Sequence, residues 1–175
     1  MPDVTIRVLT EEQTRAALTA LAEVLSDCVE GGASVGFMQP FGPEDAVPFW
    51  EGVAAAVGRN ETVLVVAEVD GRAVGTVQLG VATMPNQPHR ADIKKLLVHR
   101  DARGLGLARG LMELAEDEAR KHGRRVLVLD TATGEPAEAI YERFGWLRAG
   151  VVPDYALMPD GRYCATTFFY KHLAA

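Results

Sequence analysis

The order of hydrophobic and polar positions predicts one strand and two helices in the first third of the chain. Residues 5–9 alternate and are rich in β-branched side chains, as expected of a strand. Thr10 and Gln13 then form a helix-start pattern, and leucines at helical spacing continue this helix to about Cys28. A second helix is predicted over residues 44–57.

The segment 30–43 separates these two helices. It reads E-G-G-A-S-V-G-F-M-Q-P-F-G-P, in which glycines and prolines accompany aromatic side chains. Long loops in compact domains are commonly functional. We therefore expect this loop to form a flap over a substrate site.

Three strands are predicted in the middle of the chain, over residues 62–69, 73–81 and 91–98. Asp70 and Gly71 lie between the first two, and an Asp-Gly pair is a strong signal for a two-residue hairpin turn. The short segments between these strands predict an antiparallel meander.

The strand that ends at Val98 leads through a glycine-containing loop into another helix. Leucines at helical spacing follow Gly106, and Gly123 stands where this helix should end. A strand over residues 126–129 then ends on Asp130.

The last part of the chain predicts one more helix and two more strands. The helix covers residues 137–143, and the first strand passes through 151–153. Residues 155–161 are predicted to form a loop, and residues 163–172 a final strand.

Composition limits the class of protein. The chain has 175 residues, 48% of them hydrophobic, which predicts a single globular domain over 1–175. The net charge of −6 disfavours nucleic acid as a partner. Cys28 and Cys164 are far apart and the histidines lack ligand spacing, so we expect no metal. No leader pattern and no apolar run of roughly 20 residues is present, so we expect a cytoplasmic protein without a membrane partner.

The glycine loop is the strongest candidate for a binding site. Gly104 and Gly106 precede a helix N-terminus, whose free N–H groups and dipole favour an anion. Glycines let the main chain approach a phosphate closely, and Arg103 and Arg109 add positive charge. The alternative is a tight strand-to-helix turn that binds nothing.

Spacing separates three kinds of phosphate loop. The nucleotide-triphosphate loop needs Gly-Lys-Ser/Thr, which is absent. Gly104, Gly106 and Gly110 read G-x-G-x-x-x-G, which is near the dinucleotide fingerprint, and Asp130 could bind a ribose. The residues after Asp130 are too few for a doubly wound sheet. Finally, Arg103, Gly106 and Ala108 match R-x-x-G-x-A, which resembles the pyrophosphate-binding motif of GNAT-superfamily N-acetyltransferases.

This resemblance extends over nearly the whole chain. The segment A-E-A-I-Y-E-R-F-G-W is similar to the superfamily pattern A-x-x-x-Y-x-x-x-G-F, with Tyr141 at the usual tyrosine. The resemblance implies an α/β (α+β) GNAT fold, with a mixed, mostly antiparallel sheet of about seven strands and about four helices. It also implies that the sheet splays after the strand ending at Val98, where the pantetheine arm of acetyl-CoA enters. The expected cofactor-binding residues are Leu97, Val98, Arg103, Gly104, Leu105, Gly106, Leu107, Ala108 and Arg109.

Three segments resemble one type within the superfamily, the tabtoxin-resistance acetyltransferases. They are R-A-D-I-K-K-L-L-V, L-D-T-A-T-G-E-P-A-E-A-I-Y and P-D-Y-A-L-M-P-D-G-R-Y-C-A-T-T-F-F-Y-K. The similarity implies acetylation of a small amine, such as a toxin or antibiotic. Asp92 stands where those relatives have glutamate, so its carboxylate reaches about one methylene less far.

Acetyl transfer requires a base for the amine and an acid for the departing thiolate. Asp92 and Asp130 lie on successive strands, and both can take the ammonium proton if the strands are neighbours. Tyr141 is the candidate acid, since a phenol with a pKa near 10 can protonate a thiolate. A backbone N–H near Leu97 or Val98 could hold the thioester oxygen. The alternatives are that the aspartates cap loops and that Tyr141 belongs to the core.

Two other functions remain open from the sequence. One is a non-catalytic acyl-CoA sensor, and the other is a protein or peptide N-acetyltransferase. Whether the enzyme acetylates a small amine or a protein, acetyl-CoA is the expected co-substrate. The protein is expected to act as a monomer or homodimer.

Overall fold

The computed structural model describes residues 1–174, which form seven strands and five α-helices. The strands are β1 (Val4–Leu9), β2 (Thr62–Val69), β3 (Arg72–Val81), β4 (Arg90–Val98), β5 (Val126–Ala132), β6 (Leu147–Leu157) and β7 (Tyr163–His172). The helices are α1 (Glu11–Ala16), α2 (Leu18–Glu30), α3 (Pro43–Gly58), α4 (Leu107–Lys121) and α5 (Pro136–Arg143), with a short 3₁₀ turn, Arg100–Ala102, before α4. The predicted fold class, a mixed and mostly antiparallel GNAT-type sheet flanked by helices, is confirmed.

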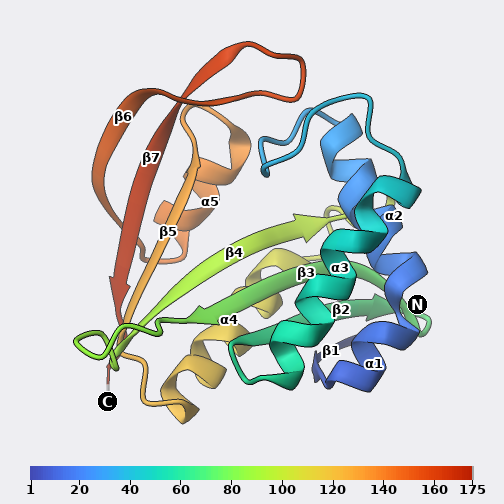
Figure 1. Cartoon of the computed structure of the whole chain (residues 1–175), viewed down its shortest axis with the longest axis horizontal. Coiled ribbons are helices and arrows are strands. Elements are labelled where there is room, and N and C mark those ends of the chain that lie inside the picture. Colours follow the sequence, from blue (N-terminus) through green and yellow to red (C-terminus); the bar gives the residue numbers. More distant parts are fainter. Residues whose placement is uncertain (175) are drawn as a thin grey trace.

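All seven strands belong to one sheet, in the order β1-β2-β3-β4-β5-β7-β6 (Figure 1). Strands β1 to β4 form the predicted antiparallel meander, and Asp70 and Gly71 both have the positive φ of a tight hairpin turn. Strand β7 is likewise antiparallel to both of its neighbours, β5 and β6. Only β4 and β5 run parallel.

The sheet opens between β4 and β5. Their ladder contains only the pairs of Arg90–Asp92 with Val126–Val128, after which the strands diverge. The splay therefore begins after Asp92, well before the end of the strand at Val98 where we expected it. Figure 1 shows the later parts of β4 and β5 diverging, and side chains of both strands line the space between them, called the wedge below.

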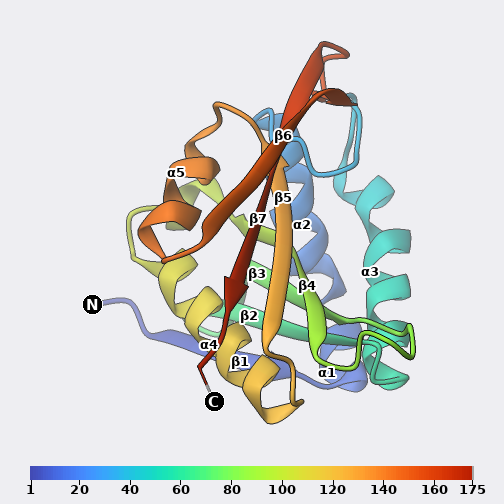
Figure 2. The same ribbon diagram turned by 90° about the vertical axis from the view of Figure 1, so that its left-hand side faces the viewer.

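Helices cover both faces of the sheet. Figure 2 shows α4 and α5 on one side and α1 to α3 on the other. On the first side, Leu111 and Met112 of α4 are fully buried in one core cluster with residues of the sheet. On the second, Leu25 of α2 and Trp50 of α3 belong to a separate cluster. The splayed sheet is thus held by a core on each face.

Three predicted elements differ from the structure. The first helix is two helices, because the backbone at Ala17 leaves helical geometry and ends α1. Strand β5 continues to Ala132, so Asp130 lies inside a strand and not at its end. Strand β6 continues to Leu157 and absorbs the start of the predicted loop 155–161, because the register shift between Val152 and Ala156 forms a bulge within the ladder.

The helices of residues 1–174 include none that is long and apolar enough to cross a membrane.

Candidate active site

The glycine loop has the geometry of an anion site. Gly104 and Gly106 have φ values of +83° and +74°, in the left-handed region that favours glycine. Gly106 precedes the first residue of α4 without any side-chain cap, so no side chain occupies the N–H groups of the first turn. A Cβ built at either glycine would meet nothing within 4 Å, so open space lies beside this main chain. The loop therefore leaves room for a phosphate at the positive end of a 15-residue helix.

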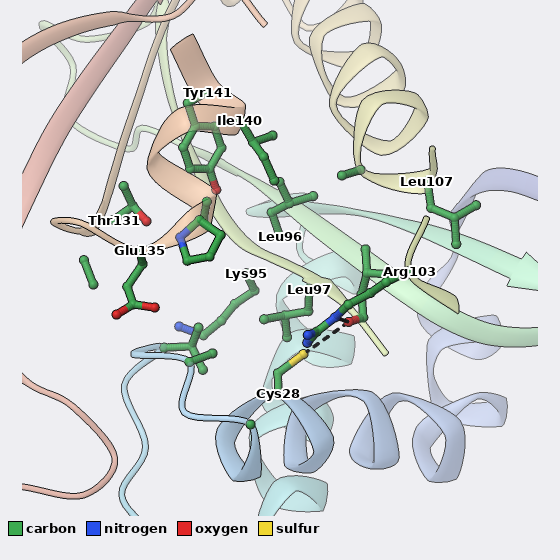
Figure 3. A pocket seen from close by; sticks show the side chains of 18 of the residues that line it. Cys28, Lys95, Leu96, Leu97, Arg103, Leu107, Thr131, Glu135, Ile140 and Tyr141 are labelled. Atoms are coloured by element: carbon green, nitrogen blue, oxygen red, sulfur yellow. Dashed lines mark hydrogen bonds between the residues drawn. The ribbon is translucent and has the colours of Figure 1, made fainter. Parts of the chain in front are cut away.

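A cavity of about 850 Å³ extends from this loop through the wedge between β4 and β5 (Figure 3). Its walls come from β4, the glycine loop, β5, α5 and the segment after α2. Eight of the nine expected cofactor-binding residues line it, namely Leu97, Val98, Arg103, Gly104, Gly106, Leu107, Ala108 and Arg109. The ninth, Leu105, is 48% exposed and is not part of the wall.

The two arginines of the loop are held in different ways. The Nε of Arg103 donates to the carbonyl oxygen of Val98 at 3.2 Å, which places its guanidinium along the cavity. The guanidinium of Arg109 lies 4.8 Å from the ring centre of Phe144, and its Nη1 is 3.8 Å from Oε1 of Glu113. Positive charge therefore stands beside the glycine main chain, and the set of donors fits the pyrophosphate of coenzyme A.

Asp130 lines the far part of the same cavity. It pairs with Phe168 of β7 in the ladder, so a strand on its other side fixes its backbone. Partial burial raises the pKa of the Asp130 carboxyl above its ordinary value, while the charge of Lys95 acts in the opposite direction. A carboxylate with a raised pKa accepts a proton more readily than an exposed one.

Tyr141 lies across the cavity on α5. Its ring packs 6.2 Å from that of Trp146 and 5.9 Å from that of Phe169, and the residue is 7% exposed. Figure 3 shows its hydroxyl pointing into the cavity. Burial, and then the charge of Asp130, raises the pKa of Tyr141 above its ordinary value. The phenol therefore stays protonated at neutral pH, and its ring belongs to the core while its hydroxyl lines the cavity.

Asp92 is placed differently from Asp130. Strands β4 and β5 are neighbours, as we expected, and Asp92 pairs with Val128, two residues before Asp130. Its side chain does not line the cavity but receives a hydrogen bond of 2.8 Å from Nη1 of Arg90. The charge of Asp92 nevertheless raises the pKa of Asp130, so the two carboxylates interact.

Sequence reasoning missed Lys95 and Cys28, which both line the cavity. Lys95 has a φ of +51°, and its ammonium lies 5.9 Å from the ring centre of Phe37 and 5.6 Å from that of Phe49. The Sγ of Cys28 lies 3.7 Å from the carbonyl oxygen of Val98, and burial raises the pKa of its thiol. A lysine pair within an otherwise apolar strand was the available signal for Lys95.

The loop between α2 and α3 forms one end of the cavity. Residues 31–35 line the wall, and Phe37 packs against Phe41 and Phe49. The hydroxyl of Ser34 donates to the carbonyl oxygen of Leu157 at 3.1 Å, and the N–H of Gln39 donates to that of Pro159 at 3.0 Å. These bonds tie the loop to the hairpin of β6 and β7.

A metal site is not evident among residues 1–174, where no three His, Cys, Asp or Glu side chains are grouped as ligands.

Comparisons with known proteins agree with this geometry. Residues 19–146 match the model of the acetyltransferase (GNAT) family. An uncharacterized N-acetyltransferase in the hisH-hisA intergenic region of Azospirillum brasilense is 35% identical over 132 residues, which is 74% of this chain and 76% of that protein.

Solved structures show the same fold. A protein from Acinetobacter baylyi ADP1, described as an acetyltransferase, superposes with a TM-score of 0.83 at 19% identity, over 99% of this chain and 94% of that one. The protein yncA from Salmonella typhimurium, described as an acetyltransferase with its cofactor acetyl-CoA, gives a TM-score of 0.77 at 21% identity, over 98% and 94%. With the family match and the curated relative, these findings establish that the chain belongs to the acetyltransferase (GNAT) family and is an N-acetyltransferase.

Proposed function

We propose that this enzyme transfers the acetyl group of acetyl-CoA to the amine of a small molecule, by direct attack of the amine on the thioester. The observation that carries the proposal is one continuous cavity. It has the left-handed glycines of the anion loop at one end and Asp130 with Tyr141 at the other. Donor and acceptor can therefore meet without a covalent enzyme intermediate.

Asp130 acts as the base in this proposal. A free amine is protonated at neutral pH, and it must lose one proton before its lone pair can attack the carbonyl carbon. The carboxylate takes this proton directly or through one water, and its raised pKa brings its basicity closer to the operating pH. Asp92, held by Arg90 outside the cavity wall, contributes negative charge that attracts the acceptor.

Tyr141 acts as the acid. When the carbon–nitrogen bond has formed, the carbon–sulfur bond breaks and the sulfur leaves with the electron pair. The Tyr141 hydroxyl gives its proton to that sulfur, and the proton taken by Asp130 returns through solvent to the phenolate. Main-chain N–H groups near Leu97 and Val98, on the edge of β4 that faces the wedge, stabilise the charge on the thioester oxygen.

The flap favours a small acceptor over a protein or peptide. Residues 31–42 bridge α2 and the β6–β7 hairpin through the bonds of Ser34 and Gln39. An extended peptide needs an open groove across this end, whereas a small molecule fits inside it. The resemblance to tabtoxin-resistance acetyltransferases further favours a toxin or antibiotic amine, handled in the cytoplasm where acetyl-CoA is made.

One chain supplies every group that the proposal uses, so the enzyme can act as a monomer or as a homodimer. Its net charge of −6 suits a cationic amine better than a nucleic acid.

The test is release of the free thiol of coenzyme A from acetyl-CoA in the presence of small amines, amine antibiotics and short peptides. We expect release with small amines and little release with peptides. An acyl-CoA sensor would bind acetyl-CoA and release nothing above the background rate with any amine. Faster release with peptides than with every small amine would assign the enzyme to the protein-acetylating class.

A further inference from the structure

A cation stands in the acceptor part of the cavity beside the proposed base. Strand β4 contains one extra residue opposite β3, because Lys94 pairs with Gln78 but Leu97 pairs with Thr76. In this bulge Lys95 has a φ of +51°. The Thr76 hydroxyl stabilises the bulge by donating a hydrogen bond of 3.0 Å to the Lys95 carbonyl oxygen. As a result Lys94 is exposed, whereas Lys95 is half-buried and lines the cavity.

The protein does not neutralise this ammonium directly. Within residues 1–174, Nζ of Lys95 forms neither a hydrogen bond nor a salt bridge, and its neighbours include the rings of Phe37 and Phe49. Burial and, after it, the positive charge of Lys94 lower the pKa of Lys95, and the charge of Asp130 opposes these effects. A partly buried cation without a hydrogen-bonded anion is costly to keep, so its position calls for a ligand that pairs with it.

The acceptor part of the cavity holds charges of both signs, from Lys95 and from Asp130 and Glu135, besides the arginines of the glycine loop and α5. Asp130 and Lys95 both line it and interact electrostatically, as the opposing effects on their pKa values show. An acceptor with only positive charge would be attracted by Asp130 and repelled by Lys95. An acceptor with only an amine and an apolar body would leave Lys95 unpaired.

We propose that the acceptor carries a carboxylate as well as its amine, as amino acids and related small molecules do, and that Lys95 binds the carboxylate while Asp130 receives the ammonium. The inference rests on the proposed function, since it names the class of substrate for the same site. Lys95 is then the residue that determines specificity. The ring faces of Phe37 and Phe49 hold its ammonium in place by cation–π contacts.

The experiment compares amino acids with their carboxamides as acceptors. Each carboxamide keeps the α-amine and the side chain but loses the negative charge. The two amines differ in basicity, so a single comparison is not informative. The quantity to measure is the kcat/KM of the amino acid divided by that of its carboxamide, and how this ratio changes from the wild type to Lys95→Met. Methionine has an unbranched side chain only one atom shorter than that of lysine, and it removes the charge.

We expect Lys95→Met to lower this ratio about tenfold or more, as for the loss of a charge-assisted contact. The loss should lie mainly in the KM of the amino acid, and the affinity for acetyl-CoA should not change. Lys95→Arg should restore most of the ratio. Lys94→Met is the matched control, one residue away but exposed; its loss of charge favours the ionised form of Lys95, so it should not lower the ratio. Lys95→Gln is a second neutral variant if Lys95→Met does not fold.

The outcomes separate the two proposals. Turnover of amines with an unchanged ratio in both neutral variants overturns the role of Lys95 and leaves the proposed function standing. An equal loss of kcat/KM for the amino acid and its carboxamide also overturns the role of Lys95, because Lys95 would then act on Asp130 and not on the carboxylate of the acceptor. No turnover of any amine, despite acetyl-CoA binding, overturns the proposed function and this inference together.

Discussion

The guanidinium of Arg90 binds the carboxylate of Asp92 on the same strand, with 2.8 Å between Nη1 and Oδ1. Arg90 stands at the first rung of the ladder between β4 and β5, and Asp92 at the last, where the sheet begins to open. Asp92 is therefore near Asp130 along the sheet but already has a cation as its partner. The two aspartates, which looked equivalent in the sequence, have different roles to test.

Asp92→Asn should change the environment of Asp130 more than it changes catalysis directly. The negative charge of Asp92 raises the pKa of Asp130, so its removal should lower that pKa. The acidic limb of the kcat/KM profile should move to lower pH, and the acceptor KM should rise less than about tenfold. Steady-state rates between about pH 5 and pH 9 measure the position of the acidic limb and the acceptor KM. Asp117→Asn, on the exposed face of α4, is the control. An acidic limb that does not move would contradict the coupling of the two carboxylates.

Asp130→Asn should remove the acidic limb altogether. The amide cannot accept the proton of the amine, so kcat/KM should fall by about 10²-fold or more at neutral pH. The remaining activity should follow only the ionisation of the amine itself, rising with pH. An acidic limb that persists in this variant would show that another group is the base.

The same substitution should stabilise the protein at neutral pH. Burial raises the folded-state pKa of Asp130, so its ionisation costs stability as the pH rises through that value. A neutral asparagine avoids this cost, although it also removes a charge that favours ionised Lys95. Because Asp130 is exposed to solvent, we expect only a small rise of Tm at pH 7, and we expect the difference from wild type to vanish below about pH 4. Thermal unfolding of the wild type and of Asp130→Asn at pH 7 and below about pH 4 tests this expectation. A lower Tm for Asp130→Asn at pH 7 would mean that the attraction between Asp130 and Lys95 outweighs the effect of burial.

Tyr141→Phe should separate the hydroxyl from the ring. The ring contacts with Trp146 and Phe169 survive, so Tm should change little. We expect kcat to fall by about 10²-fold with unchanged acetyl-CoA affinity, because the proton donor for the thiolate is gone. Thiol release and calorimetric binding measure the two quantities. Full activity would assign the residue to the core alone.

Gly106→Ala and Gly123→Ala form a matched pair for the anion loop. Both glycines have positive φ, +74° and +69°, so either substitution should cost about 1 kcal/mol of folding free energy. Only the Cβ at position 106 lies where a phosphate must approach, so only that variant should lose acetyl-CoA affinity, by about tenfold. Equal affinity in the two variants would argue against a phosphate at this loop.

Much of the fold follows from local signals. The Asp70–Gly71 turn, the apolar strands around it and the glycines before α4 each fix a backbone conformation over a few residues, and the structure contains all of them. The glycine loop also predicted one part of the cavity wall, because a strand, a loop and a helix in succession determine where that main chain faces.

The structure differs from the sequence prediction where contacts between residues far apart in the chain determine the local conformation. Pairing with β7 carries β6 through the bulge at Pro153 and Asp154, residues that alone favour a turn. The bulge that turns Lys95 into the cavity depends on how β3 pairs with β4. Arg90 and Asp92, two residues apart, share a face of the strand, but only the structure shows that their side chains pair with each other. Alternation along a sequence does not contain this information.

The short ladder between β4 and β5 joins the two parts of the sheet at one end only. Backbone hydrogen bonds hold the β1–β4 meander and the β5–β7 group separately, and only three residue pairs join them. Side chains of both groups, such as Ile93 and Phe169, share one core cluster across the joint. The cavity in the wedge is lined from both groups, so a molecule bound there would bridge two parts of the sheet that the backbone ladder joins only at the opposite end.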